Sequence, residues 1–318
     1  MAVNRGGHPR NLRPRQSLSM EICRGGRPLN SHNAIIVGAG PAGLTAATYL
    51  ARFRRKALVL DGGPPRASWI PESHNTPGFP QGVGGAELLS RMREQALRYG
   101  AVIEAGRADR LEKATGVYRV VIDGEAVSAE FVLLATGVVD IKPDLPGLDD
   151  AIRRSLVRIC PICDAFEAID KRIAVLSDSD LGAREALFLR TYSPSVTVLR
   201  VGGGLSGRAR LDTLGIEVID LDLSAIELAG DEVLAGGRRF DCLYLAFGCE
   251  MESRLALRWG AEHDAAGNLI VDAHQQTSLD RIYAAGDVVR GLNQIAVAVG
   301  EAAIAATDIH NRLRAASL

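Results

Sequence analysis

The sequence predicts an α/β protein of two Rossmann-like domains, each with three ββα layers, in which the second domain is inserted into the first. The chain has 318 residues, about twice the length of a typical domain. A strand–turn–helix–strand pattern near the start of the chain is followed by a second such pattern after residue 170. A last strand and a long helix near the C-terminus then complete the first domain.

The predicted elements alternate as two βαβ units require. The strands are short apolar runs, and the helices are rich in small or apolar residues. In chain order, we predict a strand at 34–37, a helix at 44–50, strands at 57–60, 131–137 and 171–176, a helix at 182–189, strands at 196–199 and 282–285, and a helix at 295–313.

The composition is that of an ordinary globular protein. Hydrophobic residues make up 47% of the chain, and 37 basic side chains balance 38 acidic ones. The net charge of −1 gives no general attraction for nucleic acid or for an anionic membrane surface. No apolar run reaches the length of about 18 residues that a membrane helix needs. We therefore expect a cytoplasmic protein that binds neither nucleic acid nor membrane.

Residues 1–32 are predicted to be a flexible basic extension. The first 30 residues contain six arginines and one acidic residue, Glu21, and show no helical or strand period. Their prolines and glycines argue against the amphipathic helix of an organellar transit peptide. Two interpretations stay open, namely a functional arm and a natural start at Met20.

The first strand–turn–helix segment has the chemistry of a dinucleotide site. Gly38 allows the tight turn, Gly40 lets backbone N–H groups approach a pyrophosphate, and Gly43 lets the helix pack closely. Asp61 ends the next strand 23 residues beyond Gly38. This is close to the spacing at which an acidic residue meets the ribose of the nucleotide.

Cys160 and Cys163 form the sequence Cys-Pro-Ile-Cys, and the chain has five cysteines in all. Such a pair is typical of a redox dithiol or of half a zinc site. Zinc needs about four ligands, and the other cysteines and the histidines are scattered along the chain. The redox interpretation is therefore preferred, because two cysteines at this spacing can close a small disulfide ring.

Taken together, these segments resemble the low-molecular-weight thioredoxin reductases, which are FAD-dependent pyridine nucleotide-disulfide oxidoreductases. The resemblance covers about residues 33–318. It rests on the motifs Gly38-Ala-Gly-Pro-Ala-Gly43, Asn75-Thr-Pro-Gly-Phe-Pro80, Ala135-Thr-Gly137, Cys160-Pro-Ile-Cys-Asp164, Ala285-Gly-Asp287 and Gln294-Ile-Ala296.

The resemblance implies FAD as the cofactor. The glycine turn would hold its pyrophosphate, Asp61 the adenosine ribose and Asp287 the ribityl chain, while Asn75 and Gln294 would lie along the isoalloxazine. The implied cofactor-binding residues are Gly38, Gly40, Pro41, Ala42, Gly43, Asp61, Gly62, Asn75, Thr136, Gly137, Gly286, Asp287, Gln294 and Ile295.

The resemblance also implies the chemistry of the dithiol and the domain organisation. Cys163 would exchange electrons with the flavin, Cys160 would interchange with the substrate disulfide, and Asp164 would donate and accept the proton that thiol–disulfide exchange needs. The FAD domain would comprise residues 33–146 and 275–318, with an inserted NADPH-type domain at 147–274. Family members are usually homodimers, so we expect a homodimer, while rotation of the two domains stays open.

The sequence departs from the family at the second nucleotide site. Family members have a Gly-Gly-Gly-Asp run there and a basic cluster after the next strand. Here residues 176–182 read Leu-Ser-Asp-Ser-Asp-Leu-Gly, and Arg200 is the remaining basic residue. Side chains at these positions would block a pyrophosphate, and Asp178 would repel it. We therefore expect a degenerate site, as in the NADPH-independent, deeply rooted thioredoxin reductase type.

These observations predict an FAD-dependent thiol–disulfide oxidoreductase that works without NADPH. Electrons would pass between the flavin, the Cys160–Cys163 disulfide and a thioredoxin-like protein or a small dithiol. A ferredoxin-like protein or another flavin carrier would supply them. Two other enzymes stay open, namely a dithiol oxidase that uses O2 and an NADPH-dependent thioredoxin reductase with an atypical nucleotide site. A non-catalytic flavin redox sensor is a further alternative.

Overall fold

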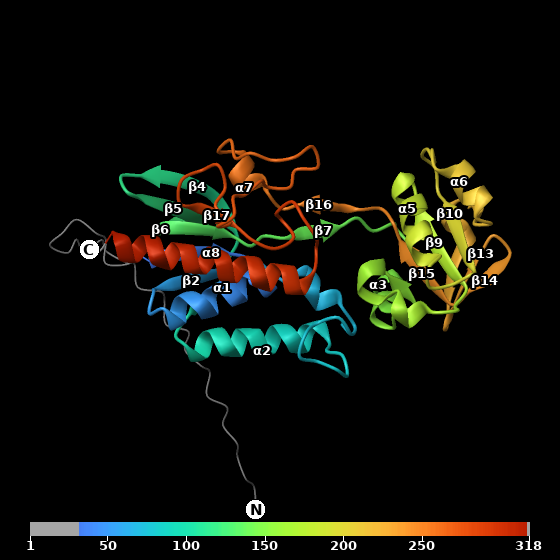
Figure 1. Cartoon of the computed structure of the whole chain (residues 1–318), viewed down its shortest axis with the longest axis horizontal. Helices are drawn as coiled ribbons and strands as arrows, with labels where there is room; N and C mark the ends of the chain where they lie inside the picture. The colour runs from blue at the N-terminus through green and yellow to red at the C-terminus, as the bar shows by residue number, and fades with distance from the viewer. Residues whose placement is uncertain (1–31, 317–318) are drawn as a thin grey trace, which may run out of the picture.

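Two α/β domains make up the computed structural model, which describes residues 32–316, so that all of the predicted basic extension except its last residue lies outside the described residues. The domains are joined by the antiparallel pair of β7 (Val138–Asp140) and β16 (Cys249–Met251) (Figure 1). The chain leaves the first domain along β7 and returns along β16. The second domain is therefore inserted into the first, as the sequence predicts.

A seven-stranded sheet forms the centre of the first domain. Its order is β3-β2-β1-β6-β5-β4, and β17 pairs with β6. The pairs from β3 to β6 and the pair of β17 with β6 are parallel, whereas β5 and β4 add an antiparallel meander. The strands are β1 (His32–Val37), β2 (Ala57–Asp61), β3 (Val102–Ala105), β4 (Ala108–Ala114), β5 (Val117–Ile122), β6 (Glu125–Leu134) and β17 (Ile282–Ala284).

Three helices cover one face of this sheet, namely α1 (Pro41–Arg52), α2 (Gly85–Arg98) and α8 (Ile295–Ala315) (Figure 1). Small side chains such as Ala46 and Ala305 are fully buried between them. Their size lets α1 and α8 approach closely. Helix α1 follows β1 and helix α8 follows β17, and both strands run parallel to β6. The N-termini of α1 and α8 therefore lie near the same edge of the sheet.

The first domain resumes earlier than the sequence predicts. Ala256, Ala261 and Leu269 are buried in the same core as Ile35 of β1. The residues after β16 therefore belong to the first domain, and the predicted boundary at 274/275 is wrong. The reason is that this segment contains one short helix, α7 (Arg254–Leu257), and irregular turns, so no hydrophobic period marks it.

The second domain has a five-stranded parallel sheet in the order β11-β10-β9-β15-β8 and a three-stranded antiparallel sheet packed against it. Its strands are β8 (Val157–Arg158), β9 (Ile173–Ser177), β10 (Val196–Arg200), β11 (Glu217–Asp220), β12 (Ile226–Ala229), β13 (Glu232–Ala235), β14 (Arg238–Phe240) and β15 (Cys242–Leu245). Its helices are α3 (Leu148–Arg153), α4 (Pro161–Asp164), α5 (Asp180–Leu189) and α6 (Arg208–Thr213). Short 3-10 turns are η1 (Arg66–Trp69) in the first domain and η2 (Phe166–Ala168) and η3 (Leu223–Ala225) in the second.

The fold class predicted from the sequence is confirmed, since each domain contains a parallel sheet with a strand–turn–helix crossover. The predicted strands and helices are all present, with ends that differ by a few residues. Within residues 32–316, no helix is long and apolar enough to span a bilayer.

Glu185 of α5 makes the stability of the second domain depend on pH. Its Oε2 atom is buried and has no hydrogen-bond partner among the described residues. Burial raises the pKa of this carboxyl from 4.5 to about 7. The folded protein therefore holds the proton more tightly than the unfolded chain. The stability that the neutral carboxyl contributes is complete below pH 4.5 and is lost as the pH rises through 7.

We expect Glu185→Gln to raise the free energy of unfolding by less than about 1 kcal/mol at pH 5 and by about 3 kcal/mol at pH 8. Urea unfolding at the two pH values measures both changes. Glu227→Gln, at an exposed position of β12, is the matched control and should change neither value appreciably. Equal effects of Glu185→Gln at both pH values would contradict a raised pKa of the Glu185 carboxyl in the folded protein.

Candidate active site

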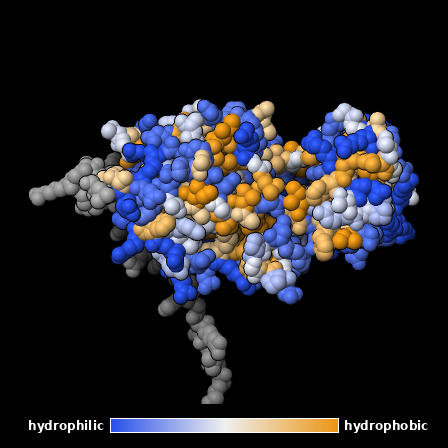
Figure 2. Space-filling model, in the orientation of Figure 1, coloured by the Kyte–Doolittle hydropathy of each residue, from blue (hydrophilic) through white to orange (hydrophobic). Residues whose placement is uncertain are grey.

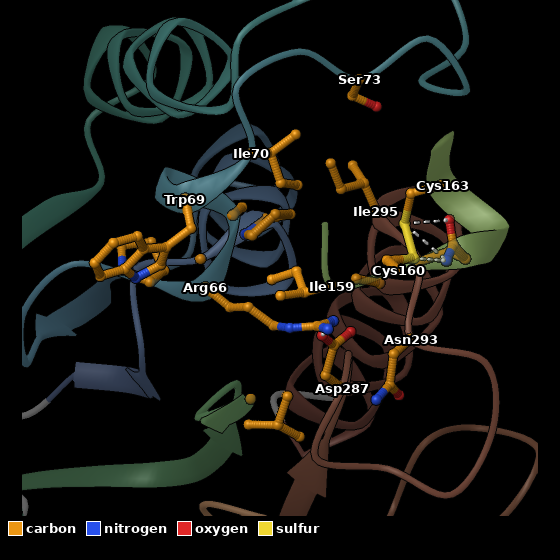
Figure 3. Close-up of a pocket in the computed structure, with 18 of the residues that line it drawn as sticks. Arg66, Trp69, Ile70, Ser73, Ile159, Cys160, Cys163, Asp287, Asn293 and Ile295 are labelled. Carbon is orange, nitrogen blue, oxygen red and sulfur yellow. Dashed lines mark hydrogen bonds and ion pairs between the residues drawn. A yellow bond between two sulfur atoms is a disulfide. The ribbon is translucent and has the colours of Figure 1, made fainter. Parts of the chain in front are cut away.

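A cavity of about 350 Å³ lies between the two domains. The first domain lines it with the N-terminus of α1, the η1 turn, the turn after β17 and the start of α8, and the second domain with α4 (Figure 3). A second cavity of about 700 Å³ continues from it along the first domain. Gly40, Arg66 and Thr136 line both cavities, so the two adjoin, and together they are called the channel below.

The glycine turn of the first domain is shaped for close backbone approach. A Cβ on Gly38, whose φ is +113°, would lie 2.2 Å from the carbonyl oxygen of Ala135. A Cβ on Gly43 would lie 1.9 Å from the carbonyl oxygen of Gly38. The N-terminus of α1 has neither a side-chain cap nor an acidic residue in its first turn. Its free backbone N–H groups and positive dipole end therefore fit a phosphate group.

Most of the predicted cofactor-binding residues line this channel. Two of them do not. Gly43 packs against the turn instead, and Asp61 pairs with Arg93 and accepts the N–H of Gly63 at 3.2 Å. The predicted residues that line the channel are Gly38, Gly40, Pro41, Ala42, Gly62, Asn75, Thr136, Gly137, Gly286, Asp287, Gln294 and Ile295.

Arg66 is a charged residue of this channel that the sequence did not reveal. Its Nε and Nη2 atoms each donate to Asp140 at 2.8 Å, and Nη1 lies 3.3 Å from Asp287. Burial opposes the guanidinium charge, yet the two carboxylates raise the pKa of Arg66 above its usual value. Burial also raises the pKa of Asp287, although Arg66 works against this. No local motif marks Arg66, because its partners lie 74 and 221 positions away.

Cys160 and Cys163 form a disulfide at the start of α4. Cys160 is the N-cap residue and Pro161 occupies the first turn, where its missing N–H costs nothing. From the first domain, Gln294 Nε2 lies 3.6 Å from Cys160 Sγ and 3.5 Å from Cys163 Sγ (Figure 3). Asn75 Nδ2 donates to Gln294 Oε1 at 2.9 Å. The disulfide thus faces the first domain and the cavity there.

Asp164 follows the disulfide and is held by two buried groups. The Arg158 guanidinium, whose side chain is 6% exposed, lies 3.3 Å from its Oδ2, and the Tyr244 hydroxyl donates to Oδ1 at 2.9 Å. Burial raises the pKa of Asp164, while the Arg158 charge and the Tyr244 hydrogen bond oppose the rise. A carboxyl with a raised pKa that lines the cavity of the disulfide is suited to proton transfer. Sequence reasoning missed both of its partners.

The turn between β9 and α5 is the counterpart of the glycine turn in the second domain. Ser177 Oγ accepts the backbone N–H groups of Ser179 at 3.2 Å and Gly182 at 3.1 Å, and it donates to the carbonyl of Ala246 at 2.9 Å. A side chain therefore occupies two backbone N–H groups of this turn, which a bound phosphate could otherwise use.

The loop after β10 closes over the same turn. The position of a Cβ on Gly203 would be only 1.6 Å from the carbonyl oxygen of Asp178, so the two backbones are in direct contact. Asp180 accepts the N–H of Ser206 at 2.6 Å. This hydrogen bond ties the loop to the first residue of α5 and leaves a carboxylate in the first turn of that helix.

Arg200, the remaining basic residue of the predicted phosphate clamp, is paired within the protein. It forms an ion pair with Asp220 of β11, and Arg208 lies 3.5 Å from the same carboxylate. Arg200 therefore has an internal counter-charge. Within the described part of the chain, no group of His, Cys, Asp and Glu side chains could hold a metal ion.

Comparison with known proteins gives the family of the chain. A profile of the pyridine nucleotide-disulphide oxidoreductase family matches residues 32–302. The thioredoxin reductase of Mycolicibacterium smegmatis is 33% identical over 299 residues, which cover 87% of this chain and 95% of that protein. The thioredoxin reductase of Streptomyces coelicolor is 34% identical over 310 residues, with 90% and 95% covered.

Solved structures agree in fold. The thioredoxin reductase from Streptococcus pyogenes superimposes with a TM-score of 0.80 at 24% identity, and the match covers 90% of this chain and 99% of that one. Together with the disulfide that faces the channel, these similarities show that the chain belongs to the pyridine nucleotide-disulphide oxidoreductase family and is a flavoprotein disulfide oxidoreductase.

Proposed function

We propose that the protein is an FAD-dependent thiol–disulfide oxidoreductase of the thioredoxin reductase type that works without NADPH. One contrast within the chain carries the proposal. The glycine turn of the first domain is open to a phosphate, whereas the turn of the second domain is closed by the Ser177 hydroxyl and the loop at Gly203. The disulfide lies at the open site.

The residues of the channel fit FAD. The N-terminus of α1 would hold its phosphates, and Asp287 would bind the ribityl hydroxyls. Ile159 and Ile295 supply apolar walls beside the disulfide for the flavin ring (Figure 3). When bound, FAD supplies a carrier of two electrons at this position.

The dithiol transfers these electrons to the partner. Two electrons break the Cys160–Cys163 bond, and one of the two sulfurs takes a proton from Asp164. The Cys160 thiolate attacks the disulfide of the partner, and a mixed disulfide forms as one partner sulfur leaves. Cys163 then attacks Cys160, which releases the second partner sulfur and restores the bond. Cys163 returns its proton to Asp164 in that step, and the two thiolates of the partner take up protons from solvent, so the partner has gained two electrons and two protons.

An exposed apolar surface beside the disulfide supports a protein partner. Ile162 is 52% exposed, Phe166 71% and Ile169 42%, and all three lie in the ten residues that begin with the dithiol. Figure 2 shows further apolar residues along the edge of the second domain that faces the first. Such a patch next to a reactive group is typical of a docking surface. The similarity to thioredoxin reductases favours a thioredoxin-like partner.

Anaerobic titration of the FAD-loaded protein tests the nucleotide half of the proposal. Dithionite should reduce the protein with an uptake of four electrons, two for the flavin and two for the disulfide. NADPH and NADH should leave the flavin absorbance unchanged, because the second nucleotide turn is closed. Cys163→Ser, which lacks the disulfide, is the control and should take up two electrons. Rapid bleaching of the flavin by NADPH would refute the proposal.

The same preparation distinguishes the direction of electron flow. If a dithiol is added under air, consumption of oxygen with formation of hydrogen peroxide would assign the protein as a dithiol oxidase. A reductase instead oxidises the chemically reduced flavin only when a disulfide partner is present.

Phe166→Ser tests the docking surface. Because the side chain is largely exposed, we expect unchanged unfolding and an increase of about tenfold in the KM for a thioredoxin substrate, with kcat little changed. Exchange with the small disulfide of oxidised dithiothreitol should stay at the wild-type rate. Leu214→Ser, a matched exposed residue at the end of α6, should have no effect. An equal loss with both variants would exclude a specific surface at Phe166.

A further inference from the structure

The disulfide has a hydrogen-bond donor that comes from the other domain. Gln294 stands directly before α8 of the first domain, and its Nε2 atom lies 3.6 and 3.5 Å from the sulfurs of Cys160 and Cys163. The two cysteines lie 134 and 131 positions earlier in the chain. This contact therefore exists only through the arrangement of the two domains around the cavity.

The amide of Gln294 is oriented by a chain of hydrogen bonds that begins at a buried serine. Asn75 Nδ2 donates to Gln294 Oε1 at 2.9 Å, and Asn75 Oδ1 in turn accepts the Ser73 hydroxyl at 3.1 Å. Ser73 is buried, and its hydroxyl is also 2.8 Å from that of Thr76. Since each amide oxygen accepts, each NH2 group is aimed onward, and Gln294 Nε2 is closer to the Cys163 sulfur, at 3.5 Å, than Gln294 Oε1, at 3.8 Å.

A fixed N–H donor has different effects on the two redox states of the dithiol. Disulfide sulfurs are weak acceptors, so the hydrogen bond from Gln294 stabilises the oxidised state only slightly. Reduction places negative charge on sulfur, and a hydrogen bond to a charged acceptor is about twice as strong as one between neutral groups. The donor therefore favours the reduced, thiolate form.

We propose that Gln294 is a positioning residue that stabilises the thiolate of the reduced dithiol, and that Asn75 acts through it by orienting its amide. This rests on the proposed function only in requiring that the Cys160–Cys163 disulfide is redox-active. The hydrogen bond from Gln294 would then help to determine the reduction potential of the disulfide. The first domain sets this potential from across the cavity, through the Ser73–Asn75–Gln294 chain.

The test uses Gln294→Leu in the FAD-loaded full-length protein under anaerobic conditions. The variant is equilibrated with mixtures of reduced and oxidised dithiothreitol, and the free thiols are counted by alkylation. We expect half-reduction to need about a tenfold higher ratio of reduced to oxidised dithiothreitol, which corresponds to about −30 mV for a two-electron couple. The pH at which alkylation of the reduced protein is half-maximal should rise by about one unit, a tenfold smaller thiolate population at neutral pH.

Two further variants isolate the mechanism. Asn75→Leu should shift both readouts in the same direction but less, and the double variant should behave like Gln294→Leu alone, because Asn75 acts through Gln294. Additive shifts would refute that role of Asn75. Asn311→Leu removes an exposed amide from the same helix and should change neither readout. Flavin absorbance gives the FAD content of each variant, so that loss of cofactor is separated from a change in the dithiol.

The outcomes separate this inference from the proposed function. If the wild-type disulfide does not equilibrate with dithiothreitol at all, the proposed redox function fails. If the wild-type protein titrates and Gln294→Leu titrates at the same ratio and pH, the proposed function stands and the role of Gln294 is refuted.

Discussion

The paired guanidinium of Arg66 is the contact on which the geometry of the site depends. It joins η1 to Asp140 of the linker strand β7 and to Asp287 in the turn after β17. Removal of one member of such a partly buried set would leave the others with unpaired charge, which is far costlier than the net contribution of the pair. The linker therefore has a fixed position on the first domain. Because the linker leads into the second domain, its position places α4 and the disulfide beside the cavity.

The two domains differ at the turn that leads from a central strand of the parallel sheet into the next helix. In the first turn, Gly38 and Gly43 lack the Cβ atoms that would collide with neighbouring carbonyls, and the N–H groups at the start of α1 stay free. In the second turn, the Ser177 hydroxyl accepts the N–H groups of Ser179 and Gly182. Strand order and crossover are alike in both, so the difference lies in the turn and its loop rather than in the fold.

The sequence predicted what depends on local constraints. The strands and helices follow from short-range periodicity, the glycine turn from its need for positive φ and close packing, and the dithiol from the spacing of Cys160 and Cys163. Partners that lie far apart in the chain could not be predicted. Arg158 and Tyr244 meet at Asp164 because β8 and β15 are neighbouring strands, and no motif in one sequence contains that pairing. The same holds for the irregular segment that returns to the first domain.

The contacts around the disulfide also bear on domain rotation. A family member that uses NADPH must bring two different groups to one flavin face in turn, and its second domain has to move between them. If the second domain holds no nucleotide, the disulfide is the only group of that domain that has to reach the flavin face. The hydrogen bonds from Gln294 to the sulfurs and from Arg66 to the linker would then not have to break in each catalytic cycle. A partner with its own disulfide can instead approach the exposed side of α4, where Ile162 and Phe166 lie at the surface. Electron transfer across the cavity would then require no rotation of the second domain.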